Sequence, residues 1–80
     1  MNIVYAKPAV KALERLDAPT RRRIGQGIAD IPKGDIKRLQ GHTDLYRLRV
    51  GGWRVVFSWQ DSQTVIIERI TPRGSAYKGG

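Results

Sequence analysis

The fold is decided by the run from Leu45 to Phe57, LYRLRVGGWRVVF. Apolar and polar residues alternate on both sides of Gly51-Gly52, which is typical of β-strands with one buried face. Two glycines between alternating runs favour a two-residue hairpin turn. The stretch therefore predicts an antiparallel hairpin with strands over residues 45–50 and 53–59.

A two-residue turn also fixes which side chains share a face. The core face then holds the cross-strand pairs Val50–Trp53, Leu48–Val55 and Tyr46–Phe57. On the other face Arg49 lies opposite Arg54, with Arg47 two residues along. Like charges directly opposite cost up to about 1 kcal/mol, and the hairpin has no acid to offset them. A solvated polar face explains one such pair, but three converging guanidinium groups favour a binding site.

The segments before the hairpin alternate in type. Residues 3–5 form a β-prone run, and Pro8 then opens a helix over Ala9–Leu16. After an Asp17-Ala18-Pro19 turn, Thr20–Ile31 carries isoleucines at helical spacing until Pro32. We expect these two helices to form a helical hairpin.

The remaining segments complete an α+β fold. Residues 36–43 are expected to be a polar connector, and Asp61-Ser62-Gln63 to be a turn. Thr64–Ile70 is an apolar run typical of an inner strand. The predicted order is an N-terminal strand, a helical hairpin and a three-stranded antiparallel sheet, in one domain over residues 1–80.

Composition narrows the class of function. The 80 residues include 15 Lys and Arg against 7 Asp and Glu, a net charge of +8, so a polyanion is the expected partner. The absence of cysteine excludes disulfides, Cys-based zinc ligation and a thiol nucleophile. No apolar run suits a leader or a membrane span, so we expect no membrane association and a cytoplasmic location.

Other residues leave alternatives open. Arg69 joins the arginines if the second turn has two residues and faces away if it has three. Glu68 is expected to pair with an arginine rather than to act as a catalytic base. Trp53 and Trp59 fall on the core side and are interpreted as packing residues, and His42 as structural or solvent-facing.

The helices and the tail carry further basic residues. Arg21, Arg22 and Arg23 form either a solvated helix face or a grip for an acidic partner or an RNA backbone. In the tail, Arg73 and Tyr77 combine a phosphate fork with a ring that can stack on a base, unless the tail is disordered.

These motifs resemble the RelE toxins of the RelE/ParE toxin–antitoxin superfamily. Leu39-Gln40-Gly41 followed by residues 45–57 is similar to the family block LxG…YRLRVGxYRVVY. The run from Arg69 to Tyr77 is similar to the ending RVGHRREVY, with Pro72 and Gly74-Ser75 departing from it. The resemblance covers nearly the whole chain.

The resemblance implies an activity and a site. It implies cleavage of mRNA in the ribosomal A site by attack of a ribose 2′-hydroxyl on the adjacent phosphate, without a metal or cofactor. Arg47 and Arg49 would serve attack and charge stabilisation, and Arg54 would grip the phosphate. Arg73 would serve the leaving group and Tyr77 would stack on a base. Arg69 and Lys78 are further candidates for RNA binding.

The resemblance also implies a partner, an acidic RelB-like antitoxin. We expect it to wrap the domain and to cover or distort the face with the converging arginines. Its expected docking surfaces are the helical hairpin, where Arg15 and Arg21-Arg22-Arg23 offer charge, and a free sheet edge. Two other functions remain open: a ParE-like inhibitor of DNA gyrase, and a non-catalytic nucleic-acid-binding module.

Overall fold

The structure is a computed structural model that describes residues 1–39, 41 and 44–72. Its two helices and five strands occupy these ranges: β1 Asn2–Tyr5, α1 Lys7–Glu14, α2 Ala18–Ala29, β2 Asp35–Arg38, β3 Leu45–Val50, β4 Trp53–Asp61 and β5 Thr64–Pro72. The expected α+β class is confirmed, and the sheet holds more strands than predicted.

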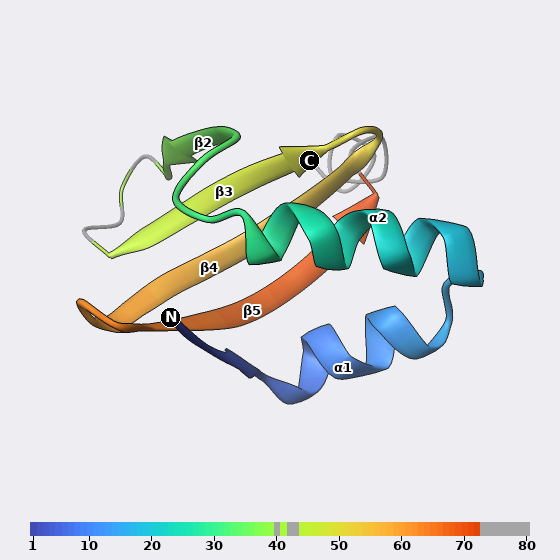
Figure 1. Cartoon of the computed structure of the whole chain (residues 1–80), viewed down its shortest axis with the longest axis horizontal. Coiled ribbons are helices and arrows are strands. Elements are labelled where there is room, and N and C mark those ends of the chain that lie inside the picture. The colour runs from blue at the N-terminus through green and yellow to red at the C-terminus, as the bar shows by residue number, and fades with distance from the viewer. Residues whose placement is uncertain (40, 42–43, 73–80) are drawn as a thin grey trace.

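The strands form one mixed sheet in the order β1-β5-β4-β3-β2. β1 pairs in parallel with β5, and the other neighbours are antiparallel. Both helices lie on the same side of the sheet (Figure 1), where they form the expected helical hairpin. β5 is an inner strand as predicted, although β4 is the middle one.

Both helices begin and end about two residues before the predicted bounds, and the prolines explain the difference for α2. Pro19 lies in the first turn of α2, as Pro8 does in α1. A proline is well tolerated there because first-turn N–H groups have no partner within the helix. Interpreting Asp17-Ala18-Pro19 as a turn was therefore wrong.

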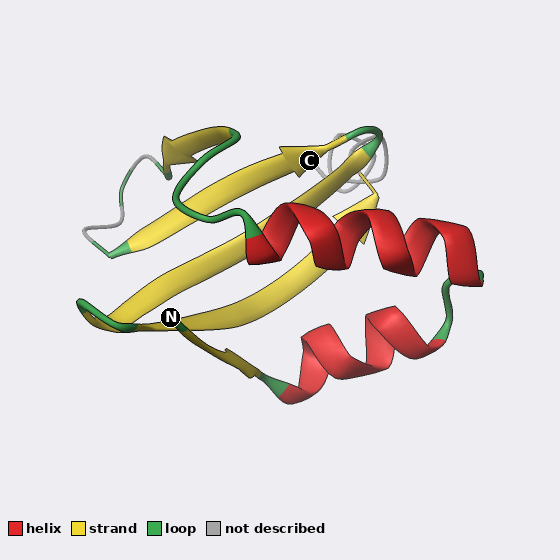
Figure 2. Ribbon diagram, viewed as in Figure 1, coloured by secondary structure: helices red, strands yellow, loops and turns green. Residues whose placement is uncertain are grey.

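The core lies between the helices and one face of the sheet (Figure 2). Ala9 from α1 and Ile24 and Ile28 from α2 are fully buried against strand residues that include Val55 and Phe57. Trp53 and Trp59 pack against this cluster, which confirms that they lie on the core side. No helix within the described ranges is long and apolar enough to cross a membrane.

The first part of the expected connector is a strand. Asp35–Arg38 forms β2 and pairs antiparallel with β3, with Asp35 opposite Arg49 and Ile36 opposite Leu48. The segment has one apolar residue in four, so the sequence gives little strand signal. Pairing with β3 stabilises this segment as a strand. Ile36 also packs on the core, and the Arg38 guanidinium lies 6.0 Å from the centre of the Tyr46 ring.

Close approach between α2 and β3 depends on one glycine. A Cβ added to Gly27 would meet a methyl carbon of Val50 at 2.8 Å, which is too close for undisturbed packing. A Cβ added to Gly25, on the same helix, would meet nothing within 4 Å. The two glycines thus provide a matched pair for testing how α2 packs.

We predict opposite effects of Gly25→Ala and Gly27→Ala on the free energy of unfolding. Gly25→Ala should raise it by up to about 1 kcal/mol, because alanine is the better helix former. Gly27→Ala gains the same propensity but overpacks the contact with Val50, so a net loss of about 1 kcal/mol is expected. Urea denaturation followed by circular dichroism measures both values. Equal stabilisation by the two substitutions would contradict the described packing.

Candidate functional site

The predicted hairpin register places the arginines as expected. Arg49 lies directly opposite Arg54, and Arg47 lies opposite Val56 on the same face. This face is the one turned away from the helices, because the alternate residues Leu48 and Val55 point into the core. We call it the arginine face and define it by Arg47, Arg49, Arg54 and Arg69.

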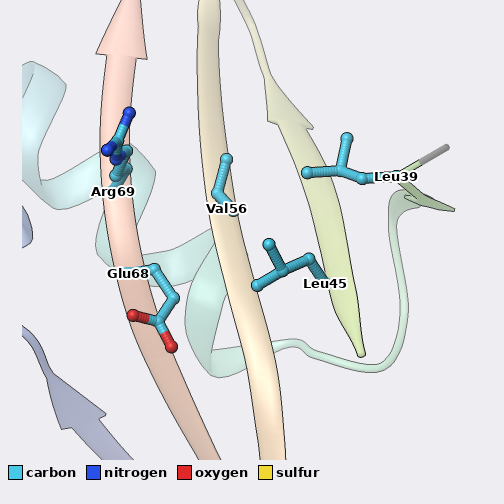
Figure 3. A pocket seen from close by; sticks show the side chains of 5 residues that line it. All are labelled: Leu39, Leu45, Val56, Glu68 and Arg69. Atoms are coloured by element: carbon cyan, nitrogen blue, oxygen red, sulfur yellow. The ribbon is translucent and has the colours of Figure 1, made fainter. Parts of the chain in front are cut away.

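Arg69 belongs to this face because the second turn has two residues, the alternative that brings Arg69 to the other arginines. Asp61 pairs with Thr64, so Ser62-Gln63 is a two-residue turn. The register then shifts between Trp59 and Asp61 and shifts back between Val56 and Phe57, so that Arg69 lies opposite Val56. The second bulge inserts Glu68 and re-aims it. Figure 3 shows Glu68 and Arg69 on the same side of the sheet although they are adjacent in the sequence.

The arginine face does contain an acid. Asp35 on β2 places its carboxylate oxygens 3.5 Å from a guanidinium nitrogen of Arg47 and 3.8 Å from one of Arg49. Arg47 also donates a hydrogen bond of 3.2 Å to the Asp35 carbonyl oxygen. The arginines were expected to converge unopposed because the hairpin itself has no acid. That expectation was wrong, because β2, a strand that the sequence did not predict, brings Asp35 to this face.

The arginines therefore differ in how far they are engaged. The Arg47 side chain is only 10% exposed, and that of Arg49 is 36% exposed. Arg54 is half-buried and Arg69 is exposed, and neither forms an ion pair or hydrogen bond within residues 1–39, 41 and 44–72. Arg54 and Arg69 are thus the arginines of this face best placed to receive an anion.

Among the described residues, Glu68 pairs with a serine and not with the expected arginine. The Ser58 hydroxyl, which is nearly buried, donates a hydrogen bond of 2.8 Å to a Glu68 carboxylate oxygen. Beside this pair lies an open hollow of about 470 Å³. The described residues that line it, shown in Figure 3, are Leu39, Leu45, Val56, Glu68 and Arg69. Sequence reasoning missed this hollow because the bulge that inserts Glu68 beside it has no glycine or proline to signal it.

The other predicted residues lie elsewhere. Arg15, after α1, and Arg21, Arg22 and Arg23 on α2 are exposed on the helical side of the sheet. His42, Arg73, Tyr77 and Lys78 lie outside the described residues. In the described part of the chain, no three His, Cys, Asp or Glu side chains gather so as to hold a metal ion.

Comparison with known proteins gives consistent relatives. A family model described as the ParE toxin of the type II toxin–antitoxin system parDE matches residues 3–77. The chain is 48% identical to RelE1 of Methanocaldococcus jannaschii over 96% of its length and 94% of that protein. It is 31% identical to toxin RelE3 of the same organism, with 96% of each chain covered.

A solved structure agrees with these relatives. The crystal structure of the RelB-RelE antitoxin–toxin complex from Methanococcus jannaschii contains a chain that matches with a TM-score of 0.76 and 30% identity. The match covers 95% of this chain and 96% of that one. The family model, the curated relatives and the fold together show that this chain is a RelE family toxin of the type II toxin–antitoxin systems, within the RelE/ParE superfamily.

Proposed function

We propose that this toxin is an endoribonuclease that cuts mRNA in the ribosomal A site. The observation that carries the proposal is Arg54: it lies directly opposite Arg49 on the arginine face and has no acidic partner in the described ranges. Two guanidinium groups held opposite each other cost stability and supply positive charge where a phosphate can bind.

The proposed reaction is attack of a ribose 2′-hydroxyl on the adjacent phosphorus, with departure of the 5′-oxygen. Arg54 grips the phosphate, and Arg49 adds charge as the phosphorane develops. Asp35 orients Arg49 and keeps Arg47 buried, so Arg47 acts mainly through the charge that it adds to the face. By resemblance we assign the leaving group to Arg73 and base stacking to Tyr77.

The general base is not an arginine in this proposal, since the guanidinium group stays protonated at physiological pH. The proton acceptor is then a group on the ribosome. Orientation and charge stabilisation by the arginines then supply the toxin's main contribution to the rate.

The family model supports a second candidate function. The model describes a ParE toxin. Inhibition of DNA gyrase is the function that a resemblance to ParE implies. The two functions predict different products, because only an endoribonuclease cuts translated mRNA. A gyrase supercoiling assay with the purified toxin is the matching positive test for the alternative.

We also propose an acidic antitoxin as the partner. The similar structure from Methanococcus jannaschii is a complex of RelE with the antitoxin RelB. In this chain Arg21, Arg22 and Arg23 are exposed on α2, on the side away from the arginine face. An acidic segment that binds these arginines and continues around a free edge of the sheet can then cover or distort the arginine face.

We predict that Arg54→Ala folds normally and loses cleavage. Removing a phosphate contact that strengthens in the transition state should cost on the order of 3 kcal/mol, or about a hundredfold in rate. Primer extension on mRNA translated in a purified system, compared with free mRNA, measures the A-site cuts.

The matched control for that experiment is Arg22→Ala, which removes the same charge from the exposed surface of α2. It should cleave at the wild-type rate in the absence of antitoxin. Wild-type cleavage by Arg54→Ala would falsify the assignment of Arg54, and the absence of A-site cuts by the wild-type toxin would refute the endoribonuclease proposal.

A further prediction concerns the partner. Replacing Arg21, Arg22 and Arg23 by glutamine should slow association with the antitoxin at low salt, because long-range attraction to an acidic chain is lost. Stopped-flow association rates over a salt series measure the effect, and the rates of variant and wild type should converge as salt rises. A salt-independent difference, or no difference at all, contradicts a role of these arginines in steering.

A further inference from the structure

The hollow on the arginine face has the composition of a small-ligand site. Leu39, Leu45 and Val56 are half-buried and give it apolar walls, and Glu68 and Arg69 supply the charged groups. Its volume of about 470 Å³ lies in the range of known ligand pockets. In Figure 3 the two leucines lie across Val56 from Glu68 and Arg69, so that the apolar and charged sides face one another.

Apolar side chains on a nucleic-acid-binding face suit a base better than a phosphate. The faces of an unstacked base gain from leaving water for an aliphatic surface, whereas its edge still needs hydrogen bonds. The leucines and Val56 offer the surface, and the strand with Glu68 and Arg69 offers the polar groups. A site that binds only phosphate does not need apolar walls, so the three aliphatic side chains favour a base as the ligand.

The Glu68 carboxylate is held in place by Ser58. The hydrogen bond of 2.8 Å comes from a hydroxyl that is only 8% exposed. A carboxylate has about four acceptor positions, so most remain available after this bond. Glu68 is therefore an oriented acceptor, and Arg69 beside it is a donor without a partner in the described part of the chain.

We infer that this hollow is a base-selective subsite that binds a guanine of the RNA substrate. Glu68 accepts hydrogen bonds from N1–H and the N2 amino group, and Arg69 donates to O6. This assignment rests on the proposed function, because it makes RNA the ligand of the face.

The same donors and acceptors disfavour the other bases. Adenine and cytosine present an unprotonated ring nitrogen to the carboxylate and an amino group to the guanidinium. Uracil offers one ring N–H and a carbonyl, so it matches with one donor fewer than guanine. The expected order is therefore guanine, then uracil, then adenine and cytosine.

The subsite lies next to the phosphate position. Val56, in the floor of the hollow, follows Arg54 by two residues on β4, a separation of about 7 Å along a strand. One nucleotide spans such a distance, so a phosphate on Arg54 and a base over Val56 can belong to the same or adjacent nucleotides.

The test is a titration of the isolated toxin with 5′-GMP, 5′-UMP, 5′-AMP and 5′-CMP, followed by NMR at the methyl groups of Leu39, Leu45 and Val56. All four share a phosphate, so their ratio of affinities isolates the base. GMP should bind about tenfold more tightly than AMP, as expected for one bidentate base contact. Glu68→Gln should reduce this preference to about twofold or less, and Ser58→Ala should reduce it partially.

The matched control is Glu14→Gln on α1, which makes the same change of charge on the helical side and should keep the full preference. Equal affinity for GMP and AMP in the wild type, a preference that survives Glu68→Gln, or unshifted methyl signals at the hollow would each overturn the inference.

Cleavage mapping separates this inference from the proposed function. A-site cuts without enrichment of guanine, together with equal GMP and AMP binding, refute the subsite and leave the endoribonuclease intact. Guanine-selective binding without A-site cuts refutes the endoribonuclease and leaves a base-selective site. Guanine enrichment that disappears in Glu68→Gln supports both.

Discussion

The two-residue turn at Gly51-Gly52 is the constraint on which the arrangement of this molecule depends. Gly51 has a φ of +58°, a conformation that other residues rarely adopt. With the turn fixed, Leu48 and Val55 point to the helices, and Arg49 meets Arg54 on the opposite face. A slip of one residue would exchange these faces, placing guanidinium groups in the core. Burial of the core therefore holds the arginines opposite each other despite their repulsion.

Sequence patterns predicted the elements that alternate strongly and failed where pairing decides the structure. The register from Val50–Trp53 to Tyr46–Phe57 followed from alternation and the turn alone. The strand Asp35–Arg38 did not follow from alternation, because only one of its four residues is apolar. Pairing with β3 stabilises it as a strand. The side on which Arg69 lies was open because the sequence does not decide the length of the second turn, which has two residues. The position of Glu68 was missed for a different reason. Two bulges shift the register and restore it, and neither is marked by glycine or proline.

The missed strand changes how the arginine face works. Asp35 engages Arg47 and Arg49, so part of the repulsion within the cluster is offset inside the protein. Exposed ion pairs contribute little to stability, and Asp35 is 50% exposed. Its larger effect is positional, since the hydrogen bond from Arg47 to the Asp35 carbonyl joins β2 to the cluster. Arg54 has no such partner in the described ranges. Asp35 thus holds Arg47 and Arg49 in place, whereas Arg54 remains available to bind an anion.

The arginine face divides into two regions with different chemistry. Toward the Gly51-Gly52 turn it presents Arg49 and Arg54, and toward the opposite end of β4 it presents Val56 and Ser58, flanked by Leu45 and Glu68. Charge alone attracts any RNA equally, because phosphates carry no sequence. Apolar walls with an oriented carboxylate can distinguish one base from another. A face built only for affinity would need the first region alone, so the second region is the part of the structure on which the proposed base selection depends.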